Sequence, residues 1–207
     1  DASIVHYYRN VHSAEVLKTY DLAGRGMPGQ LVYDEKGNPL SSDVPDDAKL
    51  AQENASKTYR YYLENFKRDS YDGKGARIDS YVRSDNMKNA MWETRGKYMV
   101  YGPQYSGALD IVGHEITHGV IQHGPDLDYQ NEPGAVNEFV ADFFGLMIEN
   151  TNQVSNSWTI GESLPGFQPP SSPMRNLSDP HNGHFDRTKK YNGKTNNGQP
   201  DHMKEFV

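Results

Sequence analysis

Two histidines and a glutamate within five residues are the first candidates for chemistry. His114, Glu115 and His118 form a His-Glu-x-x-His segment. Side chains four positions apart in a helix lie on the same face, so the two imidazoles can share one tetrahedral metal ion, for which zinc is the usual choice. Glu115 is rotated away from that face, so it is a poor third ligand but can reach a water on the metal. The alternative is a chance pentapeptide that binds no metal.

A catalytic zinc site needs a third protein ligand and one open position. Segment 134–150 supplies candidates, because it is apolar nearly all round and yet carries Glu138 and Asp142 one helical turn apart. We expect this segment to be a buried helix, in which a carboxylate is costly unless it faces a cation or strong donors. Glu138 is therefore the expected third ligand. Asp142 is expected to accept the second ring N–H of one histidine, and Asn137 that of the other.

Two helices must position these side chains. The first is expected from Ile111 to Gln122, because apolar residues recur there at helical spacing and Gly124 with Pro125 ends the pattern. The second is segment 134–150. Residues 106–150 are therefore expected to form a zinc-binding helix pair.

Residues 1–105 are expected to form a β-rich lobe. Runs of β-branched and aromatic residues predict strands at 4–8, 16–20, 30–33, 76–83 and 97–101. Alanine and tyrosine recur every three to four residues from Asp46 or Asp47 to Phe66, which predicts one long helix with acidic residues at its start. The expected fold class is α+β, with an antiparallel β-rich N-terminal lobe followed by the two helices.

Composition argues against several classes of protein. The chain has 207 residues, 21 Lys and Arg against 28 Asp and Glu, and a net charge of −7, which argues against nucleic acid as a partner. Mean hydropathy is −0.86, and no run of 18 apolar residues is present to span a membrane. Cysteine is absent, which excludes a disulfide framework and a thiolate nucleophile. The first residues do not have the pattern of a signal peptide.

The segments around the candidate ligands closely resemble the thermolysin-like neutral metallopeptidases. The matching runs are 110–120, 129–132 and 134–138. The resemblance implies a zinc-dependent endopeptidase that cleaves peptide or protein substrates on the N-terminal side of bulky hydrophobic residues. It implies that zinc is held by the two histidines and Glu138, and that Glu115 is the general base for the attacking water.

The same resemblance assigns residues to the oxyanion and to the substrate. It implies that Tyr129 stabilises the oxyanion, that Asn89 and Ala90 lie on an edge strand that pairs with the extended substrate, and that Arg175 contacts a substrate carbonyl. The alternatives are aromatic packing for Tyr129, a turn-capping side chain for Asn89 and a structural ion pair for Arg175. The residues expected to line an apolar pocket for the residue after the cleaved bond are Ile111, Ile160, Leu164 and Met174.

Calcium is a second possible metal. By the resemblance, its possible ligands are Asp110, Glu149 and Glu162. Calcium prefers six or more oxygen ligands that carry sufficient negative charge. Hydroxyl residues stand at three places where the resemblance leads us to expect acidic ligands, namely Ser157, Thr159 and Ser163. We therefore expect a weakened or lost calcium site.

The end of the chain departs from the family. Residues 198–207 resemble the segment just before an Asp-Asn-Gly-Gly-Val-His motif whose histidine helps to stabilise the transition state. That motif and the C-terminal helical domain after it are expected to be missing, so residues 151–207 are interpreted as a loop-rich, truncated start of the C-terminal lobe. Four further histidines, each more typical of a solvated loop, are candidates to replace the missing one: His123, His181, His184 and His202.

Two alternatives to an active endopeptidase follow from these departures. One is a catalytically impaired zinc-binding fragment, or a half-enzyme that needs a missing C-terminal partner. The other is a different zinc hydrolase with the same pentapeptide, which is less favoured because Asn137, Glu138 and Asp142 match the family. The resemblance to secreted peptidases implies a mature extracellular protein from which export and pro-segments have been removed.

Overall fold

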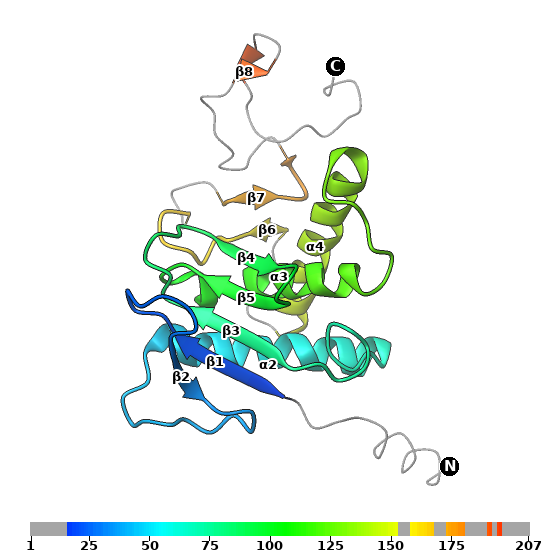
Figure 1. The fold of residues 1–207 in the computed structure, drawn as a ribbon. Coiled ribbons are helices and arrows are strands. Elements are labelled where there is room, and N and C mark those ends of the chain that lie inside the picture. Colours follow the sequence, from blue (N-terminus) through cyan, green and yellow to red (C-terminus); the bar gives the residue numbers. More distant parts are fainter. Residues whose placement is uncertain (1–15, 153–157, 168–172, 181–189, 192–193, 196–207) are drawn as a thin grey trace, which may run out of the picture.

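The computed structural model describes residues 16–152, 158–167, 173–180, 190–191 and 194–195, and its centre is a five-stranded sheet (Figure 1). The strand order is β2-β1-β3-β5-β4. The strands are β1 (Leu17–Asp21), β2 (Gln30–Tyr33), β3 (Ile78–Val82), β4 (Ala90–Glu93) and β5 (Tyr98–Tyr101). The predicted strands at 16–20, 30–33, 76–83 and 97–101 are confirmed, and the one at 4–8 lies outside the described residues.

The sheet is mixed, so the expectation of an antiparallel sheet is wrong. Strand β1 pairs antiparallel with β2, and β4 pairs antiparallel with β5. The pairings of β1 with β3 and of β3 with β5 are parallel. Connectivity explains the parallel pairing of β1 with β3. A short turn joins antiparallel neighbours, whereas the long helical crossover between β2 and β3 returns the chain so that β3 runs parallel to β1. Strand β4 lies at the edge, as expected.

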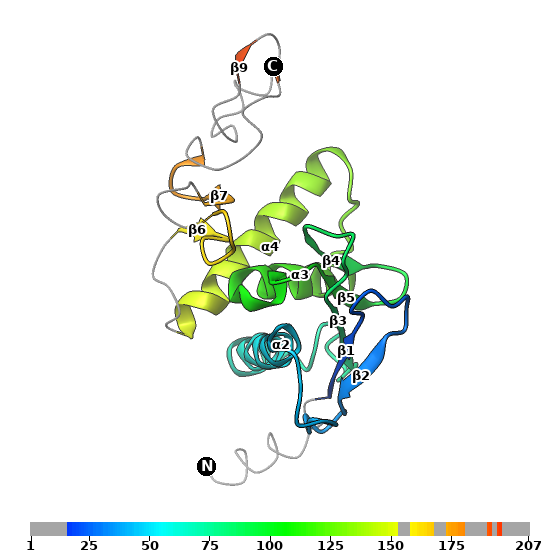
Figure 2. The same ribbon diagram turned by 90° about the vertical axis from the view of Figure 1, so that its left-hand side faces the viewer.

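One long helix, α2 (Asp46–Phe66), packs on the face of the sheet that also receives the metal-site helices (Figure 2). Its buried stripe contains alanines and tyrosines at helical spacing, as predicted. The helix ends at Lys67, whose φ of 57° lets its N–H bond back to the Leu63 carbonyl. The Tyr62 hydroxyl lies 2.7 Å from Thr117 Oγ1, which ties α2 to the next helix.

The two predicted metal-site helices are present as α3 (Leu109–Gln122) and α4 (Asn131–Thr151), and a short 3₁₀ turn, η1 (Tyr105–Gly107), precedes them. Helix α3 is buried along almost its whole length. Helix α4 is not buried all round, because Val136 and Phe139 are 49% and 61% exposed. The expectation of a fully buried second helix is therefore wrong, since no described residue covers that apolar face.

The two helices touch backbone to backbone at Gly145. A Cβ atom at this position would lie 2.5 Å from the Asp110 carbonyl oxygen and 3.2 Å from the His114 nitrogen. A side chain would therefore push the helices apart. The close approach brings the middle of α4 against the first histidine of α3.

Beyond α4, β6 (Thr159–Ile160) pairs antiparallel with β7 (Arg175–Asn176), and β8 (Lys190–Tyr191) pairs with β9 (Lys194–Thr195). The α+β class is confirmed.

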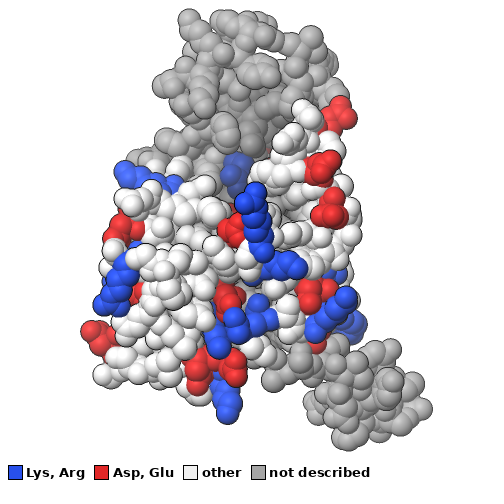
Figure 3. All heavy atoms as spheres, in the orientation of Figure 1, with Lys and Arg blue, Asp and Glu red and all other residues white. Residues whose placement is uncertain are grey.

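Basic and acidic side chains are interspersed over the face of the molecule that Figure 3 shows. None of the helices in the described residues combines the length and apolar character needed to cross a membrane.

Candidate metal centre and active-site cleft

The two histidines of α3 face each other. Their Nε2 atoms are 3.0 Å apart. The opposite ring nitrogens are held by helix α4, with His114 Nδ1 at 2.7 Å from Asp142 Oδ1 and His118 Nδ1 at 2.8 Å from Asn137 Oδ1. The Asn137 amide nitrogen donates to the Leu127 carbonyl, which supports the oxygen facing His118. Both Nδ1 atoms therefore donate a hydrogen, as expected from the sequence.

This arrangement demands a positive charge between the rings. When both Nδ1 atoms donate, each neutral ring presents a lone pair at Nε2, and two lone pairs repel at 3.0 Å. A proton or a metal cation relieves the repulsion. Two ligands about 2.0–2.1 Å from a tetrahedral ion lie about 3.3 Å apart, so the spacing is close to that of a zinc site.

Two carboxylates approach the histidine pair from different helices. Glu138 oxygens lie 3.5 Å from His114 Nε2 and 3.7 Å from His118 Nε2. Glu115 also groups with the two rings, with one ligand atom from each within 4.8 Å of the others. Glu115 Oε2 is already engaged by the Trp92 backbone N–H at 2.8 Å. Glu138 is therefore better placed as the third donor, and the donor set fits a zinc ion.

The pKa values follow from burial and these contacts. Burial and the neighbouring His114 lower the pKa of His118 to about 4. Burial also acts against the charge on His114, but the Asp142 hydrogen bond and the negative charge of Glu115 outweigh it and raise the His114 pKa. Burial raises the pKa of the Glu115 carboxyl, opposed by the charge of His114 and by the Trp92 N–H. The pair of rings thus favours one positive charge.

Asp142 is a buried hub that joins α3, α4 and β7. Its Oδ1 accepts from Arg175 Nη2 at 2.6 Å as well as from His114, and its Oδ2 accepts from Arg175 Nε at 2.6 Å. Burial alone would raise the Asp142 pKa, but these two partners hold it below its usual value. The structural ion pair that the sequence left open for Arg175 is thus present in the structure.

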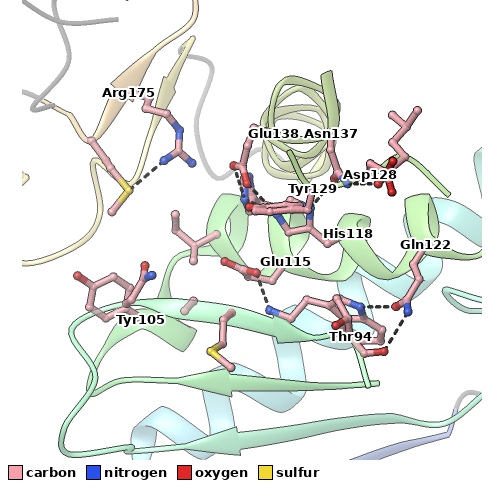
Figure 4. Close-up of a pocket in the computed structure, with 18 of the residues that line it drawn as sticks. Thr94, Tyr105, Glu115, His118, Gln122, Asp128, Tyr129, Asn137, Glu138 and Arg175 are labelled. Carbon is pink, nitrogen blue, oxygen red and sulfur yellow. Dashed lines mark hydrogen bonds and ion pairs between the residues drawn. The ribbon is translucent and has the colours of Figure 1, made fainter. Parts of the chain in front are cut away.

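A cavity of about 650 Å³ opens in front of the histidines (Figure 4). The edge strand β4 contributes Ala90, Met91 and Trp92 to its lining, and Met174 and Arg175 also line it. Of the four residues expected to form an apolar pocket, Ile111 and Met174 line the cavity, whereas Ile160 and Leu164 are buried in the core and do not line it. Asn89 and Ala90 line the wall contributed by β4 and the residue before it.

Tyr129 stands at the mouth of the cavity and is 61% exposed. Its ring contacts the His118 ring edge to face, with centroids 5.6 Å apart. Both the oxyanion role and the packing role remain compatible with this position. Glu138 is only partly buried, with 41% of its side chain exposed, because it faces the cavity rather than the core.

The possible calcium ligands also come together, in a group separate from that of the histidines. One carboxylate oxygen from each of Asp110, Glu149 and Glu162 lies within 4.8 Å of the others. Asp110 and Glu149 are buried. Asp110 accepts backbone N–H groups from Gly161 and Ile111. Burial raises the pKa of its carboxyl to about 6.

Of the candidate replacement histidines, His123 is the one that lies among the described residues, and it does not fill the cleft. His123 lies at the end of α3, where its ring contacts Tyr71 and its Nδ1 lies 2.9 Å from the Gly119 carbonyl. It does not line the cavity. His181, His184 and His202 lie outside the described residues, as does Ser157.

Sequence reasoning missed several cavity residues. Tyr105, Thr94, Gln122, Asp126 and Asp128 all line it. Gln122 offered no signal, because its partners, Trp92 on β4 and Thr94 directly after it, are distant in the chain. The acidic pair beyond α3 was visible in the sequence but had no spacing that tied it to the histidines.

Two protein-family models match consecutive parts of the chain. The model of the thermolysin metallopeptidase catalytic domain matches residues 3–122. The model of the thermolysin metallopeptidase alpha-helical domain matches residues 125–207. The second match corrects in part the expectation that the family's helical domain is missing.

Named relatives give the same family. The chain is 34% identical over 206 residues to bacillolysin of Bacillus cereus, which covers 93% of this chain and 36% of that protein. It is 39% identical over 172 residues to neutral protease NprE of Bacillus pumilus, covering 78% of this chain and 54% of that protein. The chain spans about a third of the length of the bacillolysins of Bacillus cereus and Bacillus amyloliquefaciens.

A solved structure shares the fold. The precursor of protealysin, a metalloproteinase from Serratia proteamaculans, aligns with a TM-score of 0.75 and 27% sequence identity. The alignment covers 95% of this chain and 62% of that chain.

Proposed function

This chain belongs to the thermolysin metallopeptidase family, and from that premise we propose that it is a zinc-dependent endopeptidase that hydrolyses peptide or protein substrates. One observation carries the proposal. The Nε2 atoms of His114 and His118 face each other at 3.0 Å with both opposite nitrogens held by acceptors, and the buried Glu115 and the partly buried Glu138 lie beside them in a cleft.

His114, His118 and Glu138 would hold the metal. Asp142 and Asn137 fix the tautomer and orientation of the two rings, because each accepts the Nδ1 hydrogen of one of them. When bound, zinc supplies Lewis acidity to water and to the scissile carbonyl.

Glu115 is the proposed general base. Its Oε2 accepts the Trp92 N–H, which orients the carboxylate and leaves its other oxygen to receive a proton from the attacking water. Burial raises its pKa towards neutral pH, which makes it a stronger proton acceptor than an exposed glutamate. The same carboxyl would then give the proton to the leaving amine.

The substrate is proposed to bind as an added strand on β4. Residues Ala90 and Trp92 share one side of this strand, because backbone groups alternate direction along it. The Trp92 N–H points to Glu115 and not to β5, so the Ala90 groups on that side face the cleft. An extended peptide can pair with them through backbone hydrogen bonds. Tyr129, at the cavity mouth, is the proposed donor to the oxyanion.

Cleavage on the N-terminal side of bulky hydrophobic residues is the proposed preference. Ile111 and Met174 supply apolar surface in the cavity. Arg175 also lines the cavity, and its Nη1 is 3.5 Å from the Met174 sulfur. While paired with Asp142, Arg175 can still present this nitrogen to a substrate carbonyl.

Weakened calcium binding by Asp110, Glu149 and Glu162 is a further part of the proposal, because hydroxyl residues replace expected acidic ligands at Thr159 and Ser163. A divalent cation would offset the repulsion among the three carboxylates. A secreted, extracellular location is also part of the proposal, and it rests on the resemblance of the sequence to the thermolysin-like neutral metallopeptidases.

The deciding experiment is cleavage of an internally quenched peptide by the purified chain, with and without a chelator and after zinc is restored. We expect chelator-sensitive cleavage that Glu115→Gln reduces by orders of magnitude while zinc stays bound. Stoichiometric zinc without cleavage by the parent chain would favour the catalytically impaired zinc-binding alternative, and addition of a C-terminal partner would then be the next test. Full activity of Glu115→Gln would refute the assigned base.

A further inference from the structure

The edge strand β4 is attached to the catalytic helix by the side chain of Trp92 as well as by its backbone. The indole ring lies against Gly119 of α3, where an added Cβ would be 2.9 Å from the ring. The indole Nε1–H donates to Gln122 Oε1 at 2.9 Å. Helix α3 therefore contacts Trp92 in two ways, because Gly119 leaves room for the flat indole ring and Gln122 accepts its N–H.

Gln122 makes a second contact with the same segment. Its Nε2 donates to the carbonyl oxygen of Thr94 at 2.9 Å, immediately after the end of β4. One amide thus accepts from a side chain and donates to a backbone carbonyl of the same segment (Figure 4). Both functions of the amide are needed, because a carboxylate would lack the donor and a hydrocarbon would lack both.

Glu115 and Gln122 lie two helical turns apart on one face of α3. Seven residues at 1.5 Å per residue separate them by about 10 Å along the helix axis. Glu115 holds the Trp92 backbone at one point, and Gln122 holds the Trp92 side chain and Thr94 further along. Pairing with β5 holds one edge of β4, and these two points on α3 hold its other side, so together they fix how the strand lies on the catalytic helix.

We propose that Gln122 is a positioning residue that fixes the direction of β4 on the catalytic helix, and so sets the register in which an extended substrate strand meets Glu115. This inference rests on the proposed function. Gln122 acts through Trp92 and Thr94, and it takes no part in proton transfer.

The test compares two substrates. One is a quenched peptide extended by several residues on both sides of the cleaved bond, and the other is a blocked dipeptide too short to pair along β4. In Gln122→Met we expect kcat/KM for the long peptide to fall about tenfold, equal to about 1.4 kcal/mol, while the short substrate changes less than about twofold. Equal losses on both substrates, or no loss on the long one, would overturn the proposal.

Two further variants keep the result interpretable. Gln122→Glu retains the acceptor for the indole and loses the donor to Thr94, so we expect a smaller loss confined to the long peptide. Gln30→Met is the matched control, because Gln30 lies on β2, at the opposite edge of the sheet, and accepts a side-chain hydrogen bond from Arg25. It should leave both substrates unchanged.

Binding separates this inference from the proposed function. In zinc-loaded Glu115→Gln protein, which is expected not to cleave, the dissociation constant of each substrate is measured directly. Adding Gln122→Met should weaken binding of the long peptide selectively, whether or not the parent chain is an active peptidase. If both peptides bind as tightly as before, Gln122 does not set the register.

Discussion

Removing the charge of Asp142 should damage stability and metal binding together. In Asp142→Asn, one side-chain oxygen must replace two that accept from His114 Nδ1, Arg175 Nη2 and Arg175 Nε. Whichever way the new amide is turned, its NH₂ group meets at least one N–H donor. The guanidinium of Arg175, whose side chain is only 14% exposed, is left without its counter-charge.

The magnitudes follow from this geometry. Breaking a buried ion pair by removing one partner costs about 3–5 kcal/mol, so we expect the zinc-free variant to lose about that much unfolding free energy. Loss of a carboxylate that orients a ligand histidine weakens zinc binding by about 10- to 100-fold. Adding Arg175→Met should restore much of the stability by removing the stranded charge. It should not restore zinc affinity, because His114 would still lack its carboxylate.

The assays are urea unfolding of the zinc-free proteins and competition for zinc with a chromophoric chelator. The matched control is Asp79→Asn, because Asp79 also receives two hydrogen bonds from one arginine, Arg77, whose side chain is 43% exposed. We expect a cost within about 1 kcal/mol there. The reasoning is refuted if Asp142→Asn is as stable as that control and binds zinc as tightly as the parent chain.

Two further predictions follow from burial. Gly119→Ala should destabilise the protein, because overpacking against the Trp92 ring costs about 1–3 kcal/mol while the better helix propensity of alanine returns about 1 kcal/mol. Thermal unfolding measures the difference, and an unchanged or higher Tm would contradict the close contact between Gly119 and the Trp92 ring. In calcium-free buffer the Asp110 carboxyl should contribute stability that is lost as pH rises from about 4 to about 6, opposite in sign to the contribution of His118, whose pKa is lowered. Burial raises the Asp110 pKa from 3.8 to about 6, so the folded state binds an extra proton below that pH. Asp110→Asn should remove this contribution, so the difference in unfolding free energy between parent and variant should change across this pH range, and a constant difference would exclude the raised Asp110 pKa.

The sequence predicted local features well. The spacing of His114 and His118 places both rings on one helical face whatever the rest of the fold does, and their expected partners Asp142 and Asn137 lie where helical periodicity puts them. Apolar stripes also predicted α2, α3 and α4 to within a few residues at each end.

Features that depend on distant pairing could not be predicted in this way. Strand periodicity does not distinguish a parallel neighbour from an antiparallel one, so the mixed order of the sheet was missed. The contact of Trp92 with Gln122 joins residues 30 positions apart with no pattern linking them. Helix α4 differs from its prediction in another way. Its nearly all-apolar sequence predicted that the helix is covered on every side, but Phe139 is exposed in the described structure.

The contact at Gly145 bears on how sharply the site can discriminate between metal ions. Where side chains separate two helices, a rotamer change can absorb small shifts, and axes commonly lie 8–10 Å apart. Here backbone meets backbone, so there is no soft layer between the helix that carries the histidines and the helix that carries Glu138 and Asp142. We therefore expect the spacing of the two helices to be hard to change at this contact. We also expect that a larger residue at Gly145 would move the helix that carries Glu138 and Asp142 and would alter which ions fit between the donors, although Gly145 offers no ligand atom itself.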